Sequence, residues 1–273
     1  MAPPPTYDVK RIPAVPHPGP PPIPEQEIIS KFAANEDTMK KVFDTYDFTQ
    51  AVRIEELTTG GGKFTATGQV FTRPDGKRYW RVTTQPVSTL KLMAYTIEDV
   101  RATVALPLFV LTTDEITNYN FLYAGQDKLD ELNTYVFQVK PKMLSRKRRF
   151  FDGVIWVDDH DLAIVKSYGK FVNDLPGNGT DLPFTMFETY RENFQEKYWL
   201  PTYITSDDYV TTSDNEELHL RLVIRASAFT PQPPSAPAAA APSAAPAPSP
   251  PTAAAPNPPA SPNPPPNDTP KPK

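Results

Sequence analysis

The chain has 273 residues, 35 of them proline, and its 28 basic and 32 acidic residues give a net charge of −4. Without the charged residues of the two ends (Asp8, Lys10, Arg11, Asp268, Lys271 and Lys273), 24 basic and 30 acidic residues remain, and a net charge of about −6 argues against a nucleic-acid partner. Cysteine is absent, which excludes disulfides, thiolate metal ligands and a cysteine nucleophile.

The prolines divide the chain into three parts: ten lie in residues 1–24, eighteen in 231–272, and seven between. We therefore expect a proline-rich extended arm over 1–23, one folded domain over 24–229, and a disordered Pro/Ala-rich tail over 230–273. No apolar run reaches the ~18 residues that a membrane-spanning helix needs. The first ten residues lack the apolar core of a signal peptide, so we expect a soluble chain, compatible with a mature form whose leader was removed.

The folded part begins with a helix after Pro24, because apolar residues from Ile28 to Tyr46 recur near the helical period, with a break expected around Asn35. The period then changes to two, which predicts a meander of three strands over 47–57, 63–71 and 77–84. A second helix is expected over 96–104 with Thr96 as its N-cap. Residues 106–116 read as an apolar loop or a short strand.

Further strands are expected over 118–124, 132–140, 148–157, 162–172, 183–193, 197–209 and 216–228. Ten strands with two helices predict an α+β fold dominated by one large antiparallel sheet. A sheet of this size must curl, close partly, or be covered. Its many aromatic residues either fill the core or line a cavity, and alternation alone leaves both readings open.

The segment 148–172 predicts a hairpin with a four-residue turn, which places Val157 opposite Leu162, Trp156 opposite Ala163, and Ile155 opposite Ile164. Both faces of this hairpin would then be apolar near the turn, as in a covered sheet. Gly153 and Gly169 would allow its arms to bend sharply.

The turn of this hairpin contains Asp158, Asp159, His160 and Asp161, which suggests either oxygen ligands for a divalent cation or a polar connector. The glycine-kinked ligand spacing of a calcium loop is missing, so we favour the connector and predict no metal and no cofactor. The Gly60–Lys63 run lacks the spacing and the helix of a phosphate loop, and no GxSxG elbow occurs. We therefore predict a protein that is not an enzyme.

Six basic residues gather between Lys140 and Arg149. Such a run is typical of a solvated hairpin loop, and the alternative is contact with phosphate or acidic lipid headgroups.

Three segments carry a resemblance to a known family: FDTYDFTQAVRIEEL (43–57), FFDGVIWVDDHDLAIVKSYGK (150–170) and ETYRENFQEKYWLPTYITSDD (188–208). Within them, the helix-to-strand entry Tyr46, Phe48, Thr49, Gln50 and the strand end Trp156, Val157, Asp158 are the clearest signatures. The chain resembles the LolA/LolB-like superfamily of bacterial outer-membrane lipoprotein-sorting proteins.

The resemblance implies a half-open, incomplete β-barrel of the α+β class, a large curved antiparallel sheet covered by an N-terminal helix and a short second helix. It also implies a periplasmic location and acyl chains held on the concave apolar face. Arg53 and Arg81 lie on suitable early strands for the superfamily's lid-locking arginine. The Pro/Ala-rich tail is no part of a typical carrier.

The leading hypothesis is a periplasmic carrier or binder of lipid or lipoprotein acyl chains, involved in outer-membrane lipoprotein sorting and monomeric. Alternation gives the residues expected to line its cavity: Val52, Ile54, Val70, Trp80, Phe121 and Tyr123. The alternative is a non-enzymatic envelope sensor or interaction module of the same fold that binds a protein partner. A hydrolase is the third hypothesis, and no catalytic set supports it.

Overall fold

In a computed structural model of the chain, the described residues are 19–58, 60–73, 76–104, 109–174, 184–211 and 217–232. Most of the expected N-terminal arm (1–18) and the tail from residue 233 onward lie outside them. The last strand runs to Pro231, two residues past the domain boundary expected at 229. No helix in the described ranges is long and apolar enough to cross a membrane.

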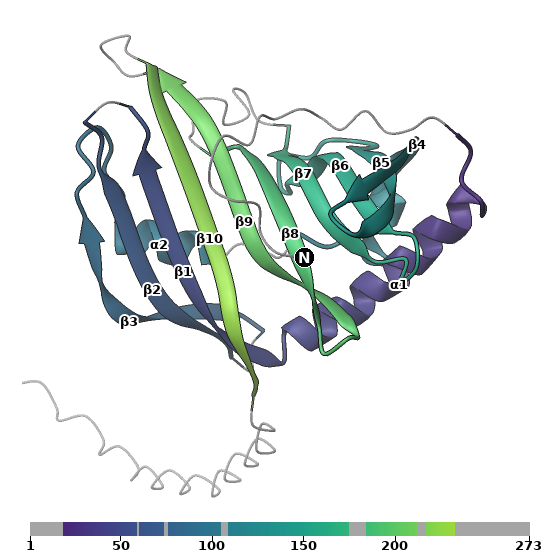
Figure 1. Ribbon diagram of the computed structural model, residues 1–273, viewed down its shortest axis with the longest axis horizontal. Helices are drawn as coiled ribbons and strands as arrows, with labels where there is room; N and C mark the ends of the chain where they lie inside the picture. The colour runs from purple at the N-terminus through teal and green to yellow at the C-terminus, as the bar shows by residue number, and fades with distance from the viewer. Residues whose placement is uncertain are drawn as a thin grey trace, which may run out of the picture. The chain divides into compact units, whose positions relative to one another are not determined.

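The predicted helices and all ten predicted strands are present, which confirms the α+β class (Figure 1). In chain order, the elements are α1 (Glu25–Phe43), β1 (Tyr46–Glu56), β2 (Lys63–Thr72), β3 (Arg78–Ser88), α2 (Ile97–Val104), the 3-10 helix η1 (Glu115–Asn118), β4 (Tyr119–Leu129), β5 (Leu132–Pro141), β6 (Phe150–Asp158), β7 (Ile164–Val172), β8 (Met186–Phe194), β9 (Tyr198–Thr211) and β10 (Glu217–Pro231).

The strands form one antiparallel sheet in the order β3-β2-β1-β10-β9-β8-β7-β6-β5-β4. Every neighbour in this order is a chain neighbour except β1 and β10, which bring the two ends of the domain together. The edge strands β3 and β4 do not pair, so the curved sheet stays open, and the connection between them carries α2 and η1 (Figure 1). This is the incomplete barrel that was expected.

Helix α1 is continuous, so the break expected around Asn35 is wrong. Asparagine often disrupts a helix because its side chain competes for nearby backbone groups. Here the Asn35 amide instead donates to the carbonyls of Asp161 and Leu162, both at 2.9 Å, and ties the helix to the turn between β6 and β7. The N-cap expected at Thr96 is confirmed for α2, since Thr96 and Asp99 exchange backbone-to-side-chain hydrogen bonds.

The inner face of the sheet, which packs on α1, carries two clusters of buried side chains. The first core joins the N-terminal half of α1 to β4–β7 and is centred on Ile28, Phe32, Phe137, Ile155 and Ile164. The second core joins the C-terminal half of α1 to β1, β2, β3, β9 and β10 and is centred on Met39, Phe43, Val52, Ile54, Phe64 and Leu222. One amphipathic helix therefore covers both halves of the sheet.

A third cluster lies on the other side of the sheet and is called the outer patch: Val136, Trp156, Ala163, Val165 and Trp199. The hairpin β6–β7 thus has apolar side chains on both faces near its turn, as predicted. Its predicted register is wrong, since the observed pairs are Val157 with Ile164, Trp156 with Lys166, and Ile155 with Ser167. A bulge between Trp156 and Val157 and a wider turn, closed by the Asp158 N–H and the Ala163 carbonyl at 2.9 Å, account for the difference.

Candidate functional site

All six residues predicted to line a cavity lie on the inner face of the sheet. Four of them, Val52, Ile54, Val70 and Trp80, are buried in the second core. The other two, Phe121 and Tyr123, are half-buried on the open edge strand β4 and pack against the first core. The ring of Phe121 meets that of Phe32 on α1 edge-on, with centroids 5.7 Å apart. The structure brings the six residues to one face but into two separate clusters.

An ion pair connects α1 to the inner face of the sheet. Both guanidinium nitrogens Nη1 and Nη2 of Arg191, on β8, bind the two carboxylate oxygens of Glu36, with Nη2 to Oε2 at 3.0 Å. The side chains of Glu36 and Arg191 are only 2% and 3% exposed. Two parallel bonds of this kind fix both distance and orientation.

The same carboxylate also holds the connection between the two edge strands. The Leu111 N–H donates to Glu36 Oε2 at 3.2 Å, and one residue further along α1 the Asp37 carboxylate accepts from the Thr113 hydroxyl at 2.6 Å. Helix α1, strand β8 and the segment 109–113 therefore meet at one buried polar centre, which lies between two apolar cores.

The residues of this polar centre were missed from the sequence. Their signal was a charged residue at a buried position of each element: Glu36 shares the helical stripe of Phe32 and Met39, and Arg191 lies two residues from Thr189 on the inner face of β8. The two residues lie 155 positions apart in the chain. The local hydrophobic pattern can therefore show that each charged residue is unusual, but it cannot show that the two form a pair.

Segment 109–113 covers the inner face beside α1. The Phe109 ring stacks on Phe151 with a centroid distance of 4.1 Å and an angle of 29° between planes. Phe151 has room because Gly153 and Gly169 pair across β6 and β7 beneath it, and a Cβ on either would approach the ring to 2.6–2.7 Å. The sequence predicts that these glycines allow bending, and the structure shows that they make room for an aromatic ring.

A second set of hydrogen bonds fixes the start of the connection between β3 and β4. The buried Glu56 carboxylate, at the end of β1, accepts the backbone N–H groups of Gly62, Lys91, Leu92 and Met93 at 2.7–3.1 Å. Burial opposes its charge, but these four donors offset that effect and lower the pKa of Glu56. The loop after β3 is thereby fixed to the β1–β2 hairpin.

The two arginines predicted to lock a lid, Arg53 and Arg81, have exposed side chains. Arg53 pairs with Glu55 on its own strand, and Arg81 donates to Gln69 at 2.9 Å on the neighbouring strand. Their described contacts run to the sheet itself, whereas two other arginines reach α1: Arg191 through Glu36, and Arg78 on β3 through the ring of Phe43, 5.4 Å away. A lid-locking role of Arg53 or Arg81 stays a prediction.

The outer face beside Arg53 has an open hollow of about 300 Å³. It is lined by Ala51, Val52, Arg53, Glu55, Thr65, Ala66, Thr67, Val223 and Arg225. One row of the sheet register leads away from it and contains two cations and three aromatic rings. Arg225 lies 5.0 Å from the Tyr203 ring, and Lys166 lies 4.9 Å from the Tyr190 ring and 4.7 Å from the Trp156 ring. This row crosses β10, β9, β8, β7 and β6.

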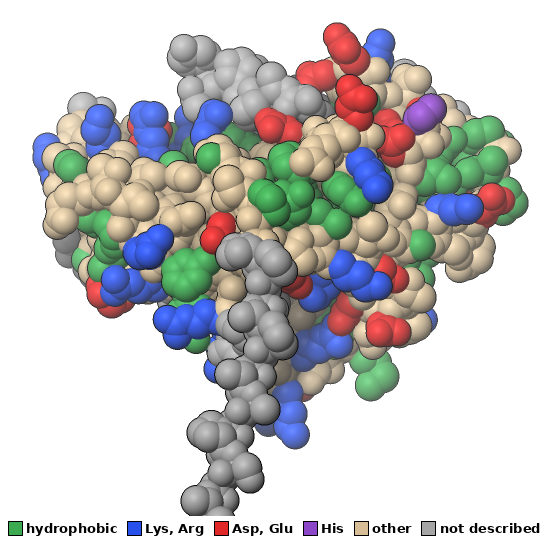
Figure 2. Space-filling view, turned by 90° about the horizontal axis from the view of Figure 1, so that it is seen from below, with side chains coloured by type: hydrophobic (Ala, Val, Ile, Leu, Met, Phe, Trp, Pro, Cys, Tyr) green, Lys and Arg blue, Asp and Glu red, His purple; other side chains and the backbone are tan. Residues whose placement is uncertain are grey.

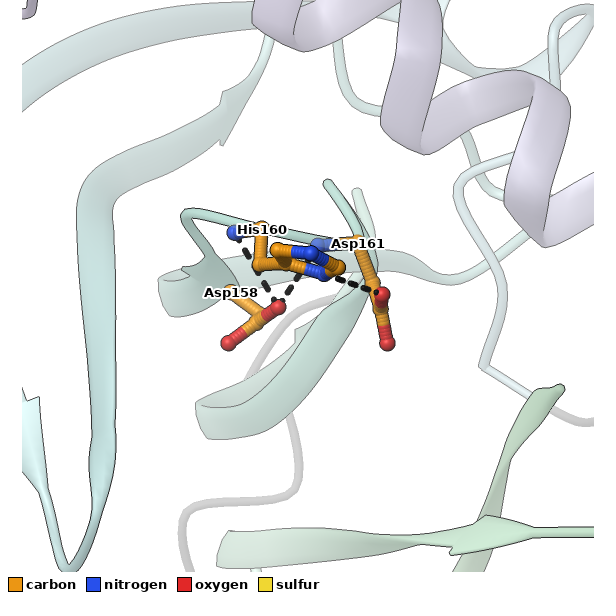
Figure 3. A group of neighbouring side chains, drawn as sticks. All are labelled: Asp158, His160 and Asp161. Atoms are coloured by element: carbon orange, nitrogen blue, oxygen red, sulfur yellow. Dashed lines mark hydrogen bonds and ion pairs between the residues drawn. The ribbon is translucent and has the colours of Figure 1, made fainter. Parts of the chain in front are cut away.

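The acidic turn between β6 and β7 brings one ligand atom each of Asp158, His160 and Asp161 within 4.8 Å of one another (Figure 3). Asp158 Oδ2 accepts the N–H groups of Asp161 at 2.7 Å and His160 at 3.2 Å, while Asp161 Oδ2 accepts Trp199 Nε1 at 2.9 Å. Burial raises the pKa of Asp158, and the hydrogen bond from Trp199 lowers that of Asp161. These carboxylates accept hydrogen bonds that stabilise the turn and attach it to Trp199, which supports the interpretation of the turn as a polar connector.

Comparison with known proteins gives no match to any family model. No curated protein matches the chain either. Solved structures of low identity do match. They include a LolA superfamily protein from Nitrosomonas europaea, with 14% identity, a TM-score of 0.41, and coverage of 77% of this chain and 94% of that one. A DUF1329 family protein from Desulfovibrio piger shares 13% identity at a TM-score of 0.34, over 76% and 93% of the two chains.

An outer membrane lipoprotein-sorting protein domain from Vibrio parahaemolyticus shares 12% identity at a TM-score of 0.31, over 72% of this chain and 94% of that one. The chain is similar to LolA superfamily proteins. At these TM-scores no residue role is transferred from them to this chain.

Proposed function

We propose that the inner face of the sheet binds acyl chains of a lipid or lipoprotein in the periplasm, with α1 and segment 109–113 as a lid. The observation that carries this proposal is the Glu36–Arg191 pair, which joins lid and sheet between two apolar cores. A buried ion pair contributes little net stability, because desolvation of the charges offsets their attraction. The pair does, however, fix the position of α1 on the sheet, whose apolar surfaces could otherwise slide past each other or separate.

An acyl chain would replace the apolar contacts that α1 makes with the sheet. Burial of a methylene contributes about 0.8 kcal/mol, so ~10 carbons would compensate for the separation of the helix from one core. The first core suits this exchange, since it borders the open edge strand β4, where Phe121 and Tyr123 are only half-buried. Binding and release then depend on apolar transfer and need no bond chemistry.

Two buried polar atoms support a ligand that also has a polar group. Within the described part of the chain, four buried side-chain polar atoms have no hydrogen-bond partner, and Trp80 Nε1 and Ser167 Oγ are two of them. Both side chains lie on the inner face of the sheet. A buried donor without a partner lowers the stability of the fold by about 1–3 kcal/mol. An ester or hydroxyl oxygen of a bound lipid would satisfy either one.

The test compares two adjacent residues of β4 that point to opposite faces. Phe121→Ala removes a ring that packs on α1, whereas Leu122→Ala removes an outward side chain that is 62% exposed. We expect mass spectrometry of gently extracted protein to find bound lipid in the wild type and in Leu122→Ala, and less in Phe121→Ala. A wild-type protein that is consistently empty, and that fails to bind a fluorescent fatty acid, would falsify the proposal.

The outer face favours a second candidate, an envelope interaction module that binds a protein partner. The hollow beside Arg53 and the row of cations and rings offer an amphipathic surface on the side away from α1. Eighteen prolines in residues 231–272 would act as a spacer or as a ligand for a groove. Removal of residues 233–273 separates the candidates: lost partner capture with unchanged lipid content favours the module.

A further inference from the structure

The loop between β5 and β6 combines positive charge with exposed apolar side chains. Residues 140–149 contain six lysines and arginines and no acidic residue, in a chain with a net charge of −4. All six basic side chains are exposed. The face drawn in Figure 2 carries both blue and red side chains. The loop therefore stands out as a local positive site.

At the tip of this loop, Met143 is 78% exposed and Leu144 is 45% exposed. They are the only sequence neighbours among the large hydrophobic residues that are exposed in the described part of the chain. Scattered single apolar residues are normal on a protein surface and need no explanation. Two adjacent ones, flanked by cations on both sides, form an apolar tip within a basic rim.

The loop is attached to its surroundings rather than free on both sides. The Lys142 N–H donates to the Asn118 carbonyl and Lys142 Nζ to that of Thr117, both at 2.8 Å. On the other side, the Asp174 N–H donates to the Ser145 carbonyl at 3.2 Å. These bonds hold the base of the loop against η1 and the end of β7, so the tip projects from a fixed base.

Two of the six cations have acidic partners. Arg148 pairs with Glu115, and Arg146 lies 3.6 Å from Asp174. For Lys140, Lys147 and Arg149, no carboxylate of the described residues lies within ion-pair distance. The cations thus exceed their acidic partners by four, and the surplus surrounds the apolar tip.

We propose that this loop docks on the surface of a membrane that contains anionic phospholipid. Met143 and Leu144 enter the boundary between headgroups and acyl chains, and Lys140, Lys147 and Arg149 contact headgroup phosphates. An apolar tip with a basic rim suits a surface that is anionic outside and apolar beneath, whereas an acidic protein or RNA would leave the tip exposed.

The docked loop would place the first core next to the bilayer, because β5 and β6, which flank the loop, carry Val139, Phe150 and Phe151 of that core. Membrane docking goes beyond the proposed acyl-chain binding. It does not depend on that proposal, since it needs only the surface of the loop.

The test measures binding to phosphatidylcholine vesicles with and without phosphatidylglycerol. The variant Lys147→Gln with Arg149→Gln removes two loop cations, and Lys31→Gln with Lys41→Gln removes two exposed cations of α1 as a matched control. Each cation at an anionic surface contributes enough that the loss of two weakens binding roughly thirty-fold at low salt. We expect this loss in the loop variant alone, and weaker wild-type binding as salt rises.

Insertion of the tip is measured separately. The chain has no cysteine, so Met143→Cys provides a single attachment site for an environment-sensitive dye. We expect a blue shift of its emission with anionic vesicles and none with phosphatidylcholine alone.

Equal binding of the wild type to both vesicles, or an equal loss in the loop variant and the α1 control, would overturn the proposal. A dye that stays in water on vesicles to which the protein is bound would overturn the insertion of the tip. Because these assays need no bound acyl chain, a protein that is empty of lipid can still pass them, and a lipid-loaded protein can still fail.

Discussion

Removal of one partner of the Glu36–Arg191 pair should destabilise the protein far more than removal of both. In Arg191→Met, the Glu36 carboxylate stays buried with the Leu111 N–H as its remaining described donor. Breaking a buried pair in this way costs about 3–5 kcal/mol. In the double variant Glu36→Leu with Arg191→Met, no charge remains, and the two apolar side chains join the cores on either side. Its stability should return to within about 1–2 kcal/mol of the wild type.

The assay is urea unfolding of the wild type, both single variants and the double variant, which together form a double-mutant cycle. Lys40→Gln serves as the control for an exposed pair, because the Lys40–Asp44 contact lies on the solvent side of α1. It should change the free energy of unfolding by no more than about 0.5 kcal/mol. Single variants at Glu36 and Arg191 that cost no more than this control would refute the reasoning.

The cycle also bears on the lid. If the pair holds α1 and segment 109–113 in place, its loss should raise the hydrogen exchange rate of the Leu111 amide before it affects amides in the β5–β6 pairing. Uniformly faster exchange throughout the sheet would mean that the pair supports global stability alone.

Two more predictions concern the edges of the covered face. Gly169→Ala should lower the free energy of unfolding by roughly 1–3 kcal/mol, because the added Cβ would approach Phe151 Cε2 to 2.7 Å. Gly19→Ala is the control and should leave stability unchanged, because nothing lies within 4 Å of its Cβ. Equal urea midpoints for the two variants would contradict this prediction. The lowered pKa of Glu56 predicts stability that is present above its ordinary pKa of 4.5 and lost as pH falls through the lower value in the folded state. Unfolding of the wild type and Glu56→Gln between neutral and acidic pH should give a difference that shrinks on acidification, and a difference independent of pH would exclude a contribution from the charge.

Local pattern predicted most of the fold because each element has its own period. The stripe from Ile28 to Tyr46 predicted α1, which ends at Phe43, and Tyr46 begins β1 instead. Alternation predicted all ten strands, with ends within a few residues for most of them. The break expected near Asn35 was wrong because its side chain found partners across the molecule, in the turn after β6. The register of β6 and β7 was wrong because the turn is wider than the four residues predicted, and because one bulged residue shifts the pairs beyond it once more.

The sequence by itself therefore determined the α+β class, the order of elements and the inward face of strands β1 to β4, because these depend on residues close in the chain. Only the tertiary structure decided which polar residues meet. Glu36 and Arg191 lie 155 residues apart, and their contact depends on how far the sheet curves and where α1 crosses it. Curvature and crossing are set by packing summed over ten strands, and no single segment records that sum.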